Sequence, residues 1–321
     1  MWKFILRRIL GMIPQLFVLS ILVFMMAKAM PGDALTGRQM DPKADPERIA
    51  EQRVQMGLND PVHVQYIRWI KNIAHGDWGV SYTHKTRVTE VIGDRIWNTV
   101  YLAFGTLLIT YLLAIPLGII SGRWNDSWMD KAITGYNYLG YATPVFIFAL
   151  LMLFLFSFTF ALFPAGGSVD PYIEPGTFSY VLNKINHLVL PVMSGALVAT
   201  VTTVQYLKNE IIDTKTRDFI RTARSKGIPD SKVYSGHILR NAFLPIAAFL
   251  GYEITGLVGG SVFIESIYSY PGIGQLFVTS VMLRDFSVVT ALVMMTSFAT
   301  LLGTLLSDII LSAVDPRIRI E

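Results

Sequence analysis

The sequence contains no cysteine and few charged residues. None of its 321 residues is cysteine, and only 16% are Asp, Glu, Lys or Arg. The first absence excludes disulfides, thiolate metal sites and a cysteine nucleophile. The second is unusual, because soluble domains contain about 25% charged residues. Together with a mean hydropathy of +0.47, this shortage of charge indicates a polytopic membrane protein.

Motifs of common hydrolases and of nucleotide-binding proteins are also missing. The sequence has no HExxH and no G-x-S-x-G, and its 5 histidines lack metal-ligand spacing. The stretch GDALTGRQ (32–39) has the glycines of a phosphate-binding loop. However, Arg38 and Gln39 stand where Lys and Ser or Thr would hold phosphate and magnesium. We therefore expect this chain to hydrolyse no ATP and to bind no cofactor or metal.

Six apolar runs are each long enough, at about 20 residues, to cross a bilayer as a helix. They span about 9–29, 99–121, 133–163, 188–207, 244–267 and 286–314. The first follows Lys3, Arg7 and Arg8 and ends in Ala-Lys-Ala, which resembles a secretory signal. Its length exceeds the core of such a signal, about 7–15 residues, and therefore favours an uncleaved first helix.

The apolar runs divide the chain into three parts. Residues 1–94 contain the first span and a long polar loop, residues 95–314 form the transmembrane core, and residues 315–321 form a tail. The N-terminus, the tail and the segments after the second and fourth spans contain more than half of the lysines and arginines. By the positive-inside rule these segments, and both termini, are cytoplasmic. The same topology accounts for the net charge of +4, so we expect no nucleic-acid partner.

The long polar loop, residues 31–98, is external in this topology. It falls in the length class that crosses the membrane regardless of its charge. Aromatic and apolar residues recur in it at helical spacing. We expect Tyr66, Trp69 and Ile70 to pack against the membrane-embedded body.

Glycine and proline give the packing signals within the spans. Gly118 with Gly122, and Gly256 with Gly260, are G-x-x-x-G pairs that let helix backbones approach closely, although such pairs also occur by chance in apolar sequences. Prolines within spans are expected to bend them around a cavity. These prolines are Pro116, Pro144 and Pro191.

The most basic short region is RDFIRTARSKGIPDSKVYSGHILRNAFLP (217–245), within a cytoplasmic segment at about 208–244. Its pattern predicts two short helices. Phe219 and Ala223 share one face of the first helix, Gly227 is placed as its C′ residue, and Asp230 can cap the second helix. One face of the second helix comprises Val233, Tyr234, His237 and Ile238. A compact helical knob should therefore project from the membrane.

This region resembles the cytoplasmic coupling loop of bacterial ABC importer permeases, most closely those of the peptide and nickel branch. The residues that carry the resemblance are Asp218, Thr222, Ala223, Arg224, Lys226, Gly227, His237, Leu239, Arg240, Asn241, Ala242 and Pro245. The general signature of such permeases begins Glu-Ala-Ala, whereas this chain has Arg221 at that place, followed by Thr-Ala. Three other stretches also resemble this family. They are the PGD after the first span, the pattern GL-DP-QY-W-GD-G-S in the external loop, and the DPRIR ending (315–319).

The resemblance implies an all-α polytopic membrane protein with the six-helix fold of type I ABC importers, located in the bacterial cytoplasmic membrane. The chain would form half of a path for oligopeptides, and a second, homologous permease subunit would form the other half. Two ATPase subunits carrying ATP and magnesium would bind the knobs, and an extracytoplasmic peptide-binding protein would deliver the cargo. Dipeptides and nickel complexes are alternative substrates of the same class.

The knob residues expected to couple to the ATPases follow from the same resemblance. They are Phe219, Arg221, Thr222, Ala223, Arg224, Ser225, Lys226 and Gly227. Basic side chains would orient the knob. Phe219, Ala223 and Ile228 would supply its apolar contact.

Candidate residues of the substrate path lie within the spans. Glu253 is an acid placed mid-span and must turn inward, either to line the path or to form a structural hydrogen bond with a neighbouring helix. Tyr138, Tyr141, Gln205 and Tyr252 have polar groups able to bind peptide backbones. Tyrosines in spans also serve simply in packing or at the interface.

The stretch FIESIYSYPGIGQLF (263–277) follows the fifth span on its outer side. Its Pro-Gly-x-Gly run breaks any helix there and predicts either a re-entrant, plug-like element or an ordinary turn. Peptide permeases have a Glu, an aromatic residue and Pro-Gly-x-Gly at this place, which the resemblance assigns to the outer gate. The matching residues are Glu265, Tyr268, Pro271, Gly272 and Gly274.

Two other classes of function make different predictions. An ion-coupled secondary carrier should have inverted repeats, broken helices and several acids within the membrane. This sequence has no evident repeat, and besides Glu253 it has Asp308 near the inner end of the last span. A channel or structural scaffold would not need a helical cytoplasmic knob.

Overall fold

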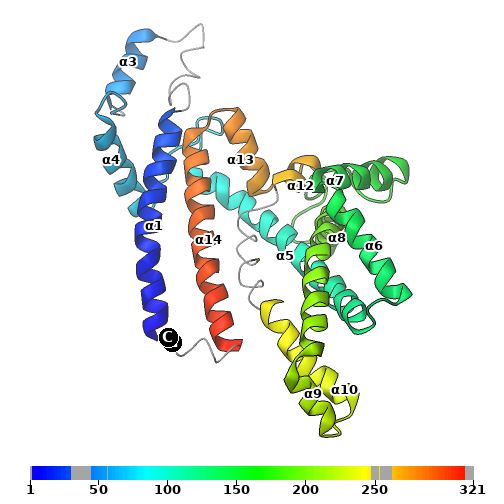
Figure 1. Cartoon of the computed structure of the whole chain (residues 1–321). Coiled ribbons are helices and arrows are strands. Elements are labelled where there is room, and N and C mark those ends of the chain that lie inside the picture. Colours follow the sequence, from blue (N-terminus) through cyan, green and yellow to red (C-terminus); the bar gives the residue numbers. More distant parts are fainter. Residues whose placement is uncertain (1, 30–44, 56, 247–252, 254–261, 315–321) are drawn as a thin grey trace.

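A computed structural model of the chain describes residues 2–29, 45–55, 57–246, 253 and 262–314. Within these ranges the chain is helical apart from turns and one isolated bridge between Val80 and Arg87 (Figure 1). The helices are α1 (Trp2–Ala29), α3 (Pro46–Gln55), α4 (Val62–Ala74), α5 (Val88–Arg123), α6 (Trp128–Ala142), α7 (Val145–Leu153), α8 (Phe178–Thr216), α9 (Asp218–Ser225), α10 (Asp230–Val233), α12 (Val262–Ile267), α13 (Ile273–Met282) and α14 (Phe286–Val314). The π-helical turns η1 (Phe154–Thr159) and η2 (Tyr234–Leu239) continue α7 and α10.

Four of the described helices, α1, α5, α8 and α14, are long and apolar enough to cross a membrane. Helices α6 and α7, with η1, pass the same test together as a bent fifth span. Most of the run at 244–267, including Gly256 and Gly260, lies outside the described residues. The last apolar run matches α14 at both ends.

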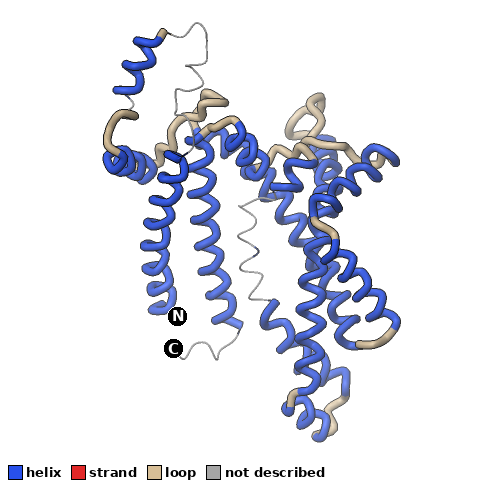
Figure 2. The backbone as a smooth tube through the Cα atoms, turned by 45° about the horizontal axis from the view of Figure 1, so that its top comes forward, coloured by secondary structure: helices blue, strands red, loops and turns tan. Residues whose placement is uncertain are grey.

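The helices form two groups joined by the diagonal helix α5 (Figure 1). In one group α1 lies beside α14, and an ion pair of 3.2 Å joins Arg8 to Asp308. In the other group α6 and α7 pack on α8. Helices α9 and α10 lie at the same end as the start of α1, while α4, α12 and α13 lie at the opposite end (Figures 1 and 2).

Two helices are longer than a membrane is thick. With 36 residues in α5 and 39 in α8, and a rise of 1.5 Å per residue, they are about 54 and 58 Å long. The hydrocarbon core of a bilayer is about 30 Å thick. One end of α8 therefore projects well beyond the bilayer, and the basic segment 217–245 is attached to that end.

The third predicted span, 133–163, corresponds to α6, α7 and η1, and the predicted bend at Pro144 is confirmed. The chain turns by 100° between α6 and α7. The cause is Pro144, which lacks an N–H and forces the preceding Thr143 into an extended conformation (φ −103°, ψ 112°). Pro116 and Pro191, by contrast, lie inside α5 and α8, which continue through them.

The pair α5 and α8 is packed most closely where α5 has glycines. A Cβ atom on Gly118 would lie 2.9 Å from the Cβ of Leu207, and one on Gly122 would lie 2.8 Å from the Cβ of Ile211. Glycine is therefore required for this approach of the two helices, and the first predicted G-x-x-x-G contact is confirmed.

The long polar loop packs on the membrane-embedded body, as the aromatic spacing predicted, and its partner there is the first span. The ring of Tyr66 meets that of Phe24 edge-on, with centroids 5.5 Å apart, and its hydroxyl is 2.8 Å from Ser20 Oγ. The ring of Trp69 lies 5.5 Å from the same phenylalanine. Helix α4 is therefore held across the end of α1, and Ile70 lines an apolar cavity there.

Candidate functional site

The basic segment 217–245, which we call the knob, consists of α9, a tight turn, α10 and η2, followed by a helical turn (Figure 1). Gly227 ends α9 with a φ of +72°, a conformation that residues with a side chain adopt at a penalty. Its N–H donates to the carbonyl of Arg224 at 2.9 Å, and the N–H of Ile228 donates to that of Ala223 at 3.4 Å. This is a Schellman motif, so Gly227 is the C′ residue, as predicted.

The predicted capping role of Asp230 is wrong. Pro229 occupies the N-cap position of α10, and no side chain caps that helix. Asp230 instead lies in the first turn, where its charge favours the helix dipole, and forms a 3.2 Å ion pair with Arg224. The pair joins α9 to α10 across the turn.

The knob has an apolar core that is continuous with α8. Ile220 and Ala223 of α9 are buried against it, three residues apart on one helix face. The other buried members of this core are Leu207, Ile211, Val233, Tyr234, Ile238, Ala242 and Ile246. Because the core includes residues of α8, the knob and the projecting end of α8 form one packed unit.

The predicted apolar contact surface of the knob is therefore partly wrong. Ala223 and Ile228 pack on the knob's own core, with Ala223 only 6% exposed. Phe219 does not share the buried face and remains 41% exposed. The inward pair is Ile220 and Ala223, because these positions face α8 rather than solvent.

Seven of the eight predicted coupling residues lie on the outer surface of the knob. All except Ala223 are exposed, and the side chain of Arg221 is 75% exposed. Its ion pair with Asp218, at 3.8 Å, lies in solvent and contributes little to stability. The knob thus presents a surface of basic and small polar side chains around one phenylalanine.

Tyr234 and Lys215 connect this end of α8 and the knob to the end of α5. The hydroxyl of Tyr234 points at the carbonyl of Ile119 at 3.4 Å, and the guanidinium of Arg123 lies 4.7 Å from its ring centre. Burial raises the pKa of Tyr234 to about 12, so the phenol stays protonated as a donor. Lys215 Nζ donates to the carbonyls of Gly122 and Arg123 at 2.6 and 2.8 Å, which stabilises the C-terminus of α5.

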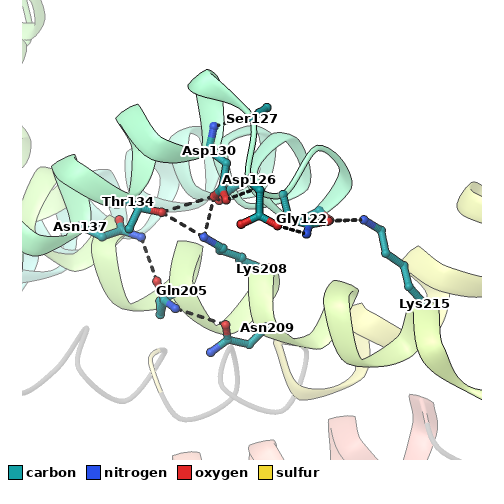
Figure 3. A network of polar contacts seen from close by, with 12 residues as sticks. Gly122, Asp126, Ser127, Asp130, Thr134, Asn137, Gln205, Lys208, Asn209 and Lys215 are labelled. Atoms are coloured by element: carbon teal, nitrogen blue, oxygen red, sulfur yellow. Dashed lines mark hydrogen bonds and ion pairs between the residues drawn. The ribbon is translucent and has the colours of Figure 1, made fainter.

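A buried ion pair lies next to these contacts (Figure 3). Lys208 of α8 donates to Asp130 of α6 at 2.6 Å, and their side chains are 13% and 7% exposed. Asp130 also accepts hydrogen bonds from Ser121, from the backbone N–H of Asp126 at 2.9 Å and from Thr134 at 3.3 Å. Its carboxylate thereby joins α5, α6 and α8 at the knob end of the molecule.

At the opposite end, Glu265 of α12 holds the start of α13. It is fully buried and accepts from Thr99 Oγ1 at 2.9 Å and from the N–H of Gln275 at 3.0 Å. The same threonine oxygen accepts from the N–H of Ile273 at 2.7 Å. A carboxylate from another helix therefore accepts from one free N–H group of α13, a threonine of α5 accepts from a second, and the negative charge favours the dipole of α13.

The other predicted gate residues belong to the same cluster. A Cβ on Gly272 would lie 2.4 Å from the Cδ of Glu265, and one on Gly274 would lie 3.0 Å from a carboxylate oxygen. Asn98 donates to the carbonyl of Pro271 at 3.1 Å. Tyr268 is buried, and its hydroxyl bridges Ser194 and the carbonyl of Ala149. The run is thus a helix, a turn and a second helix anchored on α5 and α8, and its role as a gate stays a prediction.

The predicted substrate-path residues that the structure describes on α6 and α8 have different surroundings. Tyr138 and Tyr141 are 71% and 58% exposed on α6. Gln205 lies between α6 and α8, where it accepts from Asn137 and donates to Asn209, each at 3.2 Å. An apolar cavity of about 400 Å³ lies elsewhere, among residues of α1, α4 and α14.

Glu253 and Tyr252 fall in the fifth predicted span. Tyr252 lies outside the described residues. Glu253 is described, and it shares a hydrogen bond with Tyr111 of α5. This contact matches the structural alternative given for Glu253, a hydrogen bond to a neighbouring helix, and it leaves a role in the path as a prediction.

Several residues of the site were not singled out by the sequence. In the sequence, three of them look like ordinary charged residues at the ends of spans: Asp130, Lys208 and Lys215. The two lysines belong to the cytoplasmic cations that indicate the topology. An acid and a lysine near the ends of neighbouring spans are a sequence signal for an ion pair. Their pairing needed the register between α6 and α8, which a single sequence does not give.

These observations define a class of protein: a multi-pass helical membrane protein with a compact helical knob at one end. Two family models confirm it and specify it further. One, described as "Binding-protein-dependent transport system inner membrane component", matches residues 114–320. The other, described as the N-terminal part of such membrane components, matches residues 1–103.

Relatives of known name cover the whole chain. An oligopeptide transport system permease protein, AppB of Bacillus subtilis, is 38% identical over 99% of both chains. A glutathione transport system permease protein, GsiC of Salmonella paratyphi A, is 32% identical over 99% of both chains. A putative peptide transport system permease protein of Brucella abortus is 34% identical over 100% of both chains.

A solved structure supports the fold. The MetNI methionine ABC transporter in an inward-facing conformation matches with a TM-score of 0.56 over 71% of this chain and 97% of that chain, at 13% identity. The chain therefore belongs to the family of inner-membrane components of binding-protein-dependent transport systems. It is a multi-pass permease subunit of an ABC importer, a transport component and not an enzyme. This membership sets aside the ion-coupled carrier and the scaffold.

Proposed function

We propose that this chain forms half of the transmembrane path for oligopeptides in an ATP-driven importer. The oligopeptide permease that is 38% identical over the full length supports this choice of substrate. A glutathione permease at 32% identity has a cargo that is also a short peptide by chemistry. Dipeptides and nickel complexes are alternative cargoes, which an uptake experiment separates.

The proposed partners follow from membership in the family of ABC importer permeases, and six helices alone would enclose little of a path. A homologous permease completes the path as a heterodimer, two ATPase subunits bind ATP and magnesium, and an extracytoplasmic binding protein delivers the peptide. In this arrangement the chain itself binds no cofactor. The knob, and with it both termini, faces the cytoplasm, in keeping with the basic residues at that end.

The observation that carries the proposal is the construction of the knob. Its core is shared with α8 through Leu207 and Ile211, while Arg221 and its exposed neighbours remain available to a partner. A force on the exposed surface would therefore move α8 and not merely a loop. Because Leu207 and Ile211 also pack against the glycines of α5, that helix moves with α8.

The proposed cycle is a switch between two states of the bundle. ATP binding closes the two ATPases, and the knobs follow them. The α5 and α8 pair then swings the path from inward-facing to outward-facing, because ATP favours the closed ATPase state. Hydrolysis and product release reset the path.

Uptake in a strain that lacks this chain tests the cargo. Labelled di-, penta- and decapeptides and nickel are supplied separately, with and without a plasmid carrying the chain. We expect the chain to restore uptake of the penta- and decapeptide. Restored nickel uptake with unchanged peptide uptake would overturn the oligopeptide assignment.

Purification in mild detergent tests the assembly. We expect a tagged copy of the chain to bring down a second permease and two ATPase subunits, and the complex to hydrolyse ATP. Transport of peptide by the purified chain alone, without any ATPase, would contradict the proposal.

A further inference from the structure

Helix α6 is attached to the rest of the molecule by an unusually polar contact. Its buried residues are Asp130, Ile133 and Asn137, of which two are polar. Its outer surface is open, with Trp128 76% exposed. At its far end the chain turns by 100° into α7, so backbone continuity does not fix its direction there.

The contacts between α6 and α8 recur at successive turns. Toward the end of α6 that is far from the knob, Tyr136 donates to the carbonyl of Leu197, and the missing side chain of Gly140 accommodates Val201. In the middle, Asn137 donates to Gln205 at 3.2 Å. Nearest the knob, Lys208 of α8 binds two residues of α6 (Figure 3).

Lys208 is the strongest of these connections. Its Nζ lies 2.6 Å from Asp130 Oδ1 and 3.0 Å from Thr134 Oγ1. Charge-assisted hydrogen bonds are shorter and stronger than neutral ones, and both partners are shielded from water. Removing either partner would leave a buried charge without its counter-charge, which is strongly unfavourable.

The position of Lys208 on α8 places it beside the other contacts at the knob end. It lies seven residues, or about two turns, before Lys215, so both lysines project from the same face of α8. Lys215 holds the end of α5, while Lys208 holds α6. Leu207, the neighbour of Lys208 in sequence, belongs to the core shared with the knob.

From this geometry we infer that Lys208 is a positioning residue that makes α6 move together with the knob and α8 during transport. The inference rests on the proposed function and extends it. Helix α5 follows α8 mainly through apolar packing. Helix α6 has a smaller apolar contact, in which Ile133 packs with Ala114 of α5 and Val204 of α8. Its charged contact is the pair between Lys208 and Asp130, which holds it on α8. Loss of this pair uncouples the movement of α6 from ATP hydrolysis.

The test compares variants in the reconstituted complex with its partner subunits and binding protein. In Lys208→Met we expect uptake of a labelled pentapeptide to fall about tenfold, a typical size for a coupling between sites, while the complex continues to hydrolyse ATP. Lys208→Arg keeps a cation at this position and should restore most of the uptake. A purely structural role would lower both activities together with the amount of complex.

Lys131→Met is the matched control. Lys131 lies on α6 directly after Asp130, but its side chain is exposed. We expect this variant to transport and hydrolyse like the wild type. Coupled uptake by Lys208→Met at the wild-type level would overturn the inference. A wild-type complex that takes up no pentapeptide would instead overturn the proposed function, so the two failures are distinguishable.

A distance measurement tests whether α6 moves together with α8, even if the Lys208→Met complex does not assemble. The chain has no cysteine, so spin labels attach specifically at Trp128→Cys on α6 and Asp213→Cys on α8, two residues that are both exposed. The partner subunits are used in cysteine-free form. We expect the distance between the labels to be the same with and without ATP in a complex that hydrolyses ATP. A distance that changes with nucleotide would show that α6 does not travel with α8, and would overturn the inference.

Discussion

At the scale of single residues, two glycines perform different tasks. Gly227 is needed for its backbone angle, because its φ of +72° ends α9 and turns the chain toward α10. Gly272 is needed for its lack of a side chain, because the carboxyl group of Glu265 occupies the place of a Cβ. The first requirement is local, and the second depends on a residue from a different helix.

Gly272→Ala should destabilise the protein by about 3 kcal/mol, because the added methyl group displaces the carboxylate of Glu265 from the start of α13. The measurement is thermal unfolding of the purified complex in detergent. Gly135→Ala is the control, since a Cβ there meets no atom within 4 Å and alanine favours a helix by about 1 kcal/mol over glycine. Equal melting temperatures for the two variants would contradict this account of Gly272.

Gly227→Ala should lower stability by about 1 kcal/mol, because a left-handed backbone angle is unfavourable for a residue with a Cβ. The same unfolding measurement applies. Gly236→Ala is a suitable control, because Gly236 lies in the helical part of the knob with open space around it. If both substitutions in the knob have the same effect, the turn does not depend on the angle at Gly227.

At the scale of helices, two elements start on carboxylates that are fully buried. Glu265 reaches α13 from α12, and Asp285 stands directly before α14. The carboxylate of Asp285 also binds the polar loop, accepting from Ser81 Oγ at 2.5 Å and from the N–H of Thr83 at 3.1 Å. Each acid therefore stabilises a helix and fixes a neighbouring segment at the same time.

Asp285→Ala should reduce the free energy of unfolding by about 3 kcal/mol, because Ser81 and Thr83 lose a charged partner in a buried place. We expect the loop around Thr83 to become sensitive to protease added outside the cell. Asp218→Ala, at an exposed position of α9, controls for the loss of one negative charge. Unchanged protease resistance in Asp285→Ala would show that Asp285 does not hold the loop around Thr83 in place.

At the scale of the whole molecule, the knob is joined to the spans by continuous side-chain packing. The knob core contains residues of α8, and α8 packs against the glycines of α5. Side chains on the outer surface of the knob contribute little to this core. Substitutions there should therefore alter assembly while leaving the fold intact.

Arg221→Glu should reduce the amount of ATPase that co-purifies with the permease by at least about tenfold, because it reverses a charge at the proposed contact. The amount of permease in the membrane should stay unchanged, since Arg221 makes only a solvent-exposed ion pair. Lys131→Glu, exposed on α6 outside the knob, is the control. If the Arg221→Glu permease co-purifies with as much ATPase as the wild type does, Arg221 is not part of the contact.

Much of the fold follows from local sequence patterns. Runs of about 20 apolar residues must satisfy their backbone groups internally in a membrane, so they become helices wherever they pack. The end of α9 at Gly227 was predictable because it depends on spacing within a short stretch. The inward packing of Tyr66 and Trp69 was predictable from spacing as well, whereas their partner, the first span, was not.

The sequence by itself determined the class of protein, the helices and the existence of the knob, because these depend on hydropathy, charge and turn residues read along the chain. Only the tertiary structure decided that Ala223 faces inward, that α6 and α7 meet at a sharp bend, and that Lys208 pairs with Asp130. The physical reason is that burial and ion pairing depend on the register between helices distant in sequence. That register is set by the packing of side chains from both helices, which neither segment contains alone.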